Sequence, residues 1–69
     1  MDLKKVVGKN IRKYRLLKEW SQEGLSFNSD LHRTYISSLE RGLRNPTISV
    51  IEKVAEALEV PAFKLLEEK

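Results

Sequence analysis

The sequence contains no cysteine and a single histidine, His32, among its 69 residues. Disulfides, thiolate metal sites and histidine clusters are therefore excluded as sources of stability or chemistry. No apolar run approaches the roughly 20 residues needed to span a bilayer, and the N-terminus lacks the apolar stretch and cleavage site of a signal peptide. We expect one cytoplasmic domain over residues 1–69, stabilised by core packing, helix caps and association with a second copy.

With three glycines, the sequence also has no glycine-rich phosphate loop, and its carboxylates are scattered. An enzyme needs a nucleophile with an oriented base, a metal or a phosphate loop. The sequence therefore predicts a protein without enzymatic activity, metal or cofactor. With no second domain expected, we also expect no small-molecule ligand.

Charge is abundant but unevenly distributed. Residues 1–45 carry ten Lys or Arg against five Asp or Glu, whereas residues 46–69 carry three against five. A basic N-terminal part favours a polyanionic partner. Charge alone does not distinguish DNA from RNA, from a membrane surface or from an ordinary solvated surface.

Apolar residues recur at helical spacing rather than at the alternation of strands. A first helix is predicted over about residues 2–18, where one apolar stripe contains Leu3, Val7, Ile11 and Tyr14. Gly8 costs this helix about 1 kcal/mol relative to alanine, which either a closely approaching neighbour or chance would explain. Ser21 has the chemistry of an N-cap and begins a short second helix to about residue 28.

Three further helices are predicted after a turn in which Asp30 takes the left-handed conformation. The third covers about residues 33–41 and is ended by Gly42. The fourth begins at a Ser49–Glu52 capping box and ends near Leu58. Its buried stripe comprises Ile48, Ile51, Val54, Ala55 and Leu58. A short fifth helix follows Pro61, over about residues 61–67. The sequence therefore predicts an all-α domain of five helices.

Residues 21–41 have the organisation of a helix-turn-helix, two short helices joined by a tight turn. Together with the segments around them, they make the chain resemble the Cro/repressor (Xre) family of helix-turn-helix regulators. The matching segments are Ile11-Arg12-x-x-Arg15, Ser21-Gln22-Glu23-x-Leu25, Tyr35-Ile36-Ser37-x-Leu39-Glu40-Arg41-Gly42, Arg44-Asn45-Pro46-Thr47 and Ile51-x-x-Val54-Ala55-x-Ala57-Leu58-x-Val60. The resemblance implies a lambda-repressor-like fold with the helix-turn-helix in the second and third helices.

A narrower similarity covers the start of the third helix, where His32-Arg33-Thr34-Tyr35-Ile36-Ser37 resembles the small dimeric controllers of restriction–modification systems. The sequence departs from the wider family at two positions. Ser26 stands where the family usually has alanine, and Asp30 where it has glycine. Ser26 therefore needs a hydrogen-bond partner, and Asp30 must bear mild backbone strain.

Recognition of duplex DNA requires the early residues of the third helix to reach base edges in the major groove. The predicted base contacts are Arg33, Thr34, Ser37 and Ser38. Arg33 is the candidate for a bidentate contact with guanine. The alternative is that Arg33 is solvated or bound to phosphate.

Other polar residues are predicted to hold the DNA backbone: Gln22, His32, Tyr35, Arg44, Asn45 and Arg12. Gln22 lies at a helix N-terminus, where backbone amides favour a phosphate. Three of these residues have alternative roles. Tyr35 can cover the core, His32 can cap the third helix, and Arg12 can belong to a solvated helix face.

The resemblance implies a structural role for two charged residues, since Arg15 and Glu40 would form a partly buried ion pair between the first and third helices. It also implies a dimer, because a two-fold dimer reads two half-sites about one helical turn apart. Phe63, Leu65 and Leu66 are the predicted interface, with Leu65 the strongest candidate. The alternative is that these side chains close the core.

The function implied is sequence-specific binding of double-stranded DNA and transcriptional regulation by a homodimer on a palindromic operator. An alternative is a protein-interaction module, such as an antitoxin or a bridging cofactor domain. We expect such a module to carry a toxin-binding tail beyond the DNA-binding core, whereas this sequence ends at Lys69.

Overall fold

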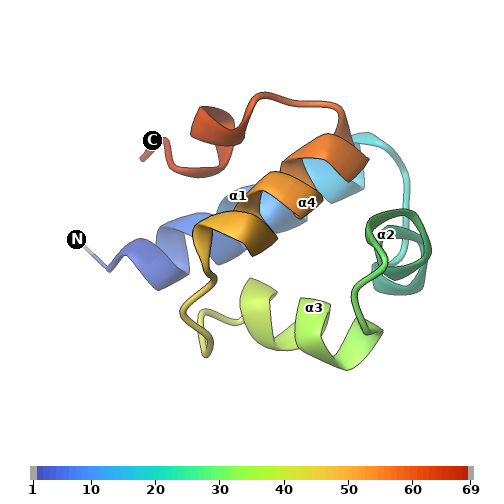
Figure 1. The fold of residues 1–69 in the computed structure, drawn as a ribbon, viewed down its shortest axis with the longest axis horizontal. Helices are drawn as coiled ribbons and strands as arrows, with labels where there is room; N and C mark the ends of the chain where they lie inside the picture. Colours follow the sequence, from blue (N-terminus) through green and yellow to red (C-terminus); the bar gives the residue numbers. More distant parts are fainter. Residues whose placement is uncertain (1, 69) are drawn as a thin grey trace.

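The computed structural model describes residues 2–68, which form four α-helices and one short 3-10 helix. In chain order these are α1 (Leu3–Leu17), α2 (Gln22–Ser29), α3 (Arg33–Glu40), α4 (Ile48–Leu58) and η1 (Ala62–Leu65). α2 and α3 form the predicted helix-turn-helix. α3 packs against α1 and α2, and η1 packs against α1 and α4 on the opposite side of the molecule (Figure 1). None of the described helices is long and apolar enough to cross a membrane.

The core collects apolar side chains from all five elements. Its fully buried members are Val7, Ile11, Leu25, Ile36, Leu39, Val54, Ala55, Leu58 and Leu65. The predicted all-helical fold is therefore confirmed. The apolar stripes were predicted too long at their N-terminal ends, since Leu3 and Ile48 are exposed. Both residues begin their helices, where the backbone has not yet reached the packed centre of the molecule.

Helix caps define the beginnings of the α-helices. The Ser21 hydroxyl accepts a hydrogen bond from the Gly24 amide at 3.0 Å, as its sequence position predicts. The predicted Ser49–Glu52 capping box is wrong. α4 begins two residues earlier because the Thr47 hydroxyl accepts from the Val50 amide at 3.1 Å, which places Ser49 inside the first turn.

The turn between α2 and α3 accommodates both departures from the family pattern. Asp30 adopts the predicted left-handed conformation, with φ of 62°. Ser26 finds the partner that its burial requires, because its hydroxyl donates to the Leu31 carbonyl across the turn. The turn therefore keeps its geometry without glycine, which confirms the expectation of mild strain at Asp30.

The predicted fifth α-helix over residues 61–67 is a single 3-10 turn, Ala62–Leu65. Since a 3-10 helix has three residues per turn, residues three apart share a face. Ala62 and Leu65 share the face that packs on the core, and Leu65 is completely buried. The prediction of Leu65 as an interface residue is therefore wrong. Phe63 and Leu66, one residue further along, are the exposed pair.

Asn10 is a buried polar residue on α1 to which its sequence position gave no role. Its side-chain amide donates to the Leu65 carbonyl at 2.9 Å and to the Glu67 carbonyl at 2.8 Å. These bonds hold the end of the described chain against α1. A signal was present, since Asn10 lies between Val7 and Ile11 on the apolar side of its helix, but an isolated asparagine in a helix is more often solvated.

Of the two explanations considered for Gly8, the close approach is present, between α1 and α3. A Cβ atom on Gly8 would lie 2.2 Å from the Leu39 carbonyl oxygen and 2.9 Å from that of Glu40. These neighbours are backbone atoms, so α3 can make room only by moving away from α1. Gly8 therefore sets the spacing between the two helices.

We expect Gly8→Ala to lower the free energy of unfolding by about 1–3 kcal/mol, the usual cost of overpacking, despite the helix propensity that alanine gains. Thermal and denaturant unfolding followed by circular dichroism measures this change. Lys9→Ala is the control, because Lys9 is the next residue and is exposed; it should change stability by less than about 0.5 kcal/mol. A Gly8→Ala protein as stable as the native one would contradict the close contact.

Candidate nucleic-acid interface

The exposed surface of α3 collects three of the four predicted base-contacting residues. Arg33 and Thr34 occupy its first turn and are exposed, whereas Ile36 and Leu39 face the core. Arg33, Thr34 and Ser37 line a shallow hollow between α3 and the beginning of α2, together with Gln22 and Glu23. The first turn of α3 is therefore open to a ligand that follows this hollow.

Ser38 is not among the residues that line the hollow. It is half-buried, and its hydroxyl donates to the Tyr35 carbonyl at 2.7 Å. Its hydrogen is thus used within α3, a backward bond that serine commonly makes in helices. The structure does not bring Ser38 together with the other three predicted base-contacting residues.

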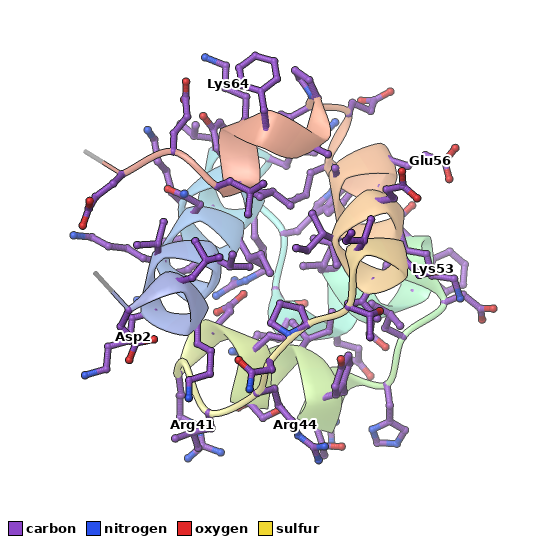
Figure 2. All side chains as sticks on the ribbon, turned by 60° about the vertical axis from the view of Figure 1, so that its left-hand side comes forward. Asp2, Arg41, Arg44, Lys53, Glu56 and Lys64 are labelled. Carbon is purple, nitrogen blue, oxygen red and sulfur yellow. The ribbon has the colours of Figure 1, made fainter. Side chains whose placement is uncertain are left out.

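Basic side chains flank the end of α3. The Arg44 guanidinium lies 5.4 Å from the centre of the Tyr35 ring, a distance at which the ring face attracts a cation. The Tyr35 ring is half-buried and packs against the core, so the core-covering role considered for it is present. Arg41 and Arg44 extend from the edge of the molecule that α3 occupies, opposite Lys64 (Figure 2). Arg41 was not assigned by the sequence analysis, although it belongs to a matching segment.

Two predicted backbone contacts lie outside this hollow. Asn45 is exposed in the loop after α3 and lines another hollow with Leu3 and Lys4 of α1, and Arg12 is exposed on α1. His32 is exposed at the start of α3, and its Nδ1 accepts a hydrogen bond from the Thr34 amide at 3.1 Å. The capping role considered for His32 is therefore present.

A buried ion pair holds α3 in place. Arg15 donates from Nε to Glu40 Oε2 at 2.7 Å and from Nη2 to Oε1 at 2.9 Å, the bidentate geometry of the strongest carboxylate pairs. The two side chains are only 8% and 3% exposed. The hydrogen bond with Glu40 raises the pKa of Arg15 above its ordinary value. Arg15 therefore stays charged and is committed to Glu40.

Two further bonds extend the pair to α2 and to the turn before it. Arg15 Nη1 donates to the Trp20 carbonyl at 2.8 Å, and Gln22 Nε2 donates to Glu40 Oε1 at 3.1 Å. Gln22 thereby supports α3 from the first turn of α2. Its amide oxygen and second amide hydrogen remain for a ligand at the N-terminus of α2, where backbone amides favour an anion.

Among residues 2–68, no three His, Cys, Asp or Glu side chains gather as metal ligands. Apart from the carboxylate of Glu23, the side chains of this surface are cations, hydroxyls and amides around one helix. Such groups bind and orient a polyanion.

We expect Glu40→Ala to remove about 3–5 kcal/mol of stability, because it leaves the Arg15 guanidinium buried without its partner. A chain of this length has roughly 3–10 kcal/mol in total, so thermal unfolding should show much of the population unfolded. The control is Glu59→Gln. Lys18 holds the pKa of Glu59 below its usual value, but this ion pair lies at the surface, and its loss should leave the melting temperature nearly unchanged.

Comparison with known proteins places these features in a family. The helix-turn-helix family matches residues 11–65. The control protein C.SmaI of Serratia marcescens is 47% identical over 66 residues, which cover 96% of this chain and 79% of that protein.

Two solved structures have the same fold. The hypothetical transcription factor NHTF from Neisseria matches with a TM-score of 0.92 at 47% identity, over 96% of this chain and 76% of that one. The restriction-modification controller protein C.Esp1396I, solved as a tetramer in complex with its natural 35 base-pair operator, matches with a TM-score of 0.86 at 42% identity, over 96% and 91% of the two chains. The chain belongs to the helix-turn-helix family.

Proposed function

We propose that this chain, as a single domain over residues 1–69, binds double-stranded DNA sequence-specifically and regulates transcription as a homodimer on a palindromic operator. Within the family, its relatives favour the role of a restriction–modification controller. The observation that carries the proposal is the exposed first turn of α3, where Arg33 and Thr34 share one hollow with Ser37 of the next turn. Such a regulator acts where the DNA lies, in the cytoplasm.

Arg33 is the principal base-reading residue in this proposal. Its side chain is exposed, and among residues 2–68 no carboxylate forms an ion pair with it. An unpaired guanidinium at the start of a recognition helix can donate two parallel hydrogen bonds to guanine O6 and N7. Arg15 cannot serve in this way, because its guanidinium is buried against Glu40.

The DNA backbone is held by groups on either side of α3. Gln22 and the α2 amides meet a phosphate on one side, and Arg44, supported by the Tyr35 ring, meets the backbone on the other. Asn45, His32 and Arg12 are exposed and add further contacts to the backbone. These groups position α3 without reading sequence.

A two-fold dimer must present both copies of α3 to the same side of the DNA. Because η1 lies across the molecule from α3 (Figure 1), an interface confined to η1 would not satisfy this condition. Both chain ends lie on one side of the molecule, the side that Figure 2 brings forward. The exposed apolar residues Leu3 and Leu66 belong to these ends. We place the dimer interface on this side, around Leu3 and Leu66, with Phe63 at its margin.

Selection of bound sites from random duplex DNA tests the whole proposal. We expect a palindromic motif with half-sites about one helical turn apart, bound with an affinity that falls steeply as salt rises. Equal affinity for all duplexes would contradict sequence-specific binding. A single half-site would contradict the dimer.

We expect Arg33→Ala to relax selection at one position in each half-site, at a cost of about 1–3 kcal/mol in binding to the preferred duplex. Arg44→Ala is the comparison. It should weaken all duplexes alike and reduce the dependence of log affinity on log salt by about one unit per chain. Fluorescence anisotropy at several salt concentrations separates the two effects. Loss of discrimination with Arg44→Ala alone would reverse the assigned roles.

Leu66→Asp should shift the chain towards monomer in analytical ultracentrifugation, because it places a charge in the proposed apolar interface. The fold should persist, since Leu66 is already 41% exposed. The matched control is Phe27→Asp, which changes an apolar side chain that is 87% exposed on α2. A dimer that survives Leu66→Asp, or dissociates with Phe27→Asp, would place the interface elsewhere.

A further inference from the structure

A contact at the beginning of α3 joins His32 to Thr34. The Thr34 amide nitrogen lies 3.1 Å from His32 Nδ1, in the geometry of a hydrogen bond that caps the helix. The Thr34 hydroxyl oxygen lies 2.7 Å from the same Nδ1. One ring nitrogen therefore faces both the amide and the hydroxyl of Thr34.

The proton positions at this contact follow from the chemistry of the groups. A backbone N–H can only donate, so Nδ1 must act as acceptor and carries no proton. An oxygen at 2.7 Å from an unprotonated nitrogen is at the distance of an O–H···N hydrogen bond. The Thr34 hydroxyl must then donate its one hydrogen to His32, and only its lone pairs remain for another partner.

These lone pairs lie in the proposed DNA-reading surface. Thr34 is exposed and lines the same hollow as Arg33 and Ser37. In the major groove, adenine N6 and cytosine N4 offer amine hydrogens, whereas guanine O6 and N7 and thymine O4 are acceptors. A hydroxyl that can only accept pairs with an amine and is repelled by an acceptor.

We propose that His32 is a positioning residue that fixes Thr34 as a hydrogen-bond acceptor, so that Thr34 selects a base carrying an exocyclic amine, adenine or cytosine. The inference rests on the proposed sequence-specific binding of DNA. It extends that function because it assigns a chemical class of base to Thr34 and makes His32 responsible for that base preference.

Selection from random duplex DNA with four proteins tests the inference. Thr34→Val keeps the size of the side chain and removes the hydroxyl, so the position whose base preference it changes is the position that Thr34 reads. There the native protein should enrich adenine and cytosine over guanine and thymine by about fivefold, the value of one neutral hydrogen bond. Thr34→Val should reduce this ratio to about one.

Two substitutions of His32 separate positioning from capping. Aspartate accepts hydrogen bonds but cannot donate them when ionised. His32→Asp should therefore keep the ratio, although its charge lowers affinity for every duplex. His32→Ala frees the Thr34 hydroxyl to donate or to accept, and should reduce the ratio to about twofold or less at this position alone. Loss of the helix cap by itself would lower stability and affinity without changing base preference. Thermal unfolding measures this loss of stability.

The possible outcomes distinguish this inference from the proposed function. If the native protein enriches no site, the proposed function fails and the inference fails with it. If it enriches a site but prefers guanine or thymine where Thr34→Val acts, the inference alone is overturned. The same holds if Thr34→Val changes no position, or if His32→Ala keeps the full ratio.

Discussion

The carboxylate of Glu40 is buried, and the geometry of the helix-turn-helix depends on how its charge is satisfied. A buried charge is tolerated only where partners replace the water that it loses. Glu40 has two such partners on different elements, Arg15 on α1 and Gln22 on α2. Since Glu40 is the last residue of α3, these bonds fix α3 relative to both other helices. Gly8 sets the distance at which they form, because it brings α1 against the α3 backbone.

This arrangement also divides the arginines by role. Arg15 is neutralised by Glu40 and contributes little field at the surface, whereas Arg33, Arg41 and Arg44 remain exposed around α3. The net charge of +3 is small, but positive charge is in local excess beside α3. Affinity for a polyanion depends on this local field rather than on the total.

The helix caps and turn conformations that depend on neighbouring residues were mostly predicted from the sequence. The Ser21 cap and the left-handed Asp30 follow from a side chain and its immediate neighbours, whereas the close approach at Gly8 is a contact with α3 that the sequence signalled only by a glycine inside a helix. Of the errors, one is local and the others depend on distant residues. Thr47 displaced Ser49, two residues away, as the cap of α4, whereas Leu65 is buried because the last turn is a 3-10 helix packed on α1 and α4. Asn10 was missed because its partners lie 55 and 57 residues away.

In the candidate site, too, some properties follow from the sequence and others depend on contacts in the folded chain. Which residues of α3 face outwards follows from helical spacing, and Arg33 and Thr34 were placed correctly on the exposed surface in this way. What each group can still donate or accept does not follow from spacing, because Ser38 is bonded to Tyr35 and Thr34 to His32.

α2 shows why stability and recognition are not separable in this chain. It has only eight residues, among them Gly24, Ser26 and Asn28, and helices of this length are marginal in water even with good helix formers. Ser29 adds a buried hydroxyl that has no hydrogen-bond partner within the described residues. α2 is therefore held by its contacts with α3 and α4 and by the bond from Gln22 to Glu40. The groups that position Gln22 in the proposed DNA-binding surface are thus the groups that keep α2 folded, and a change that weakens α2 also displaces Gln22.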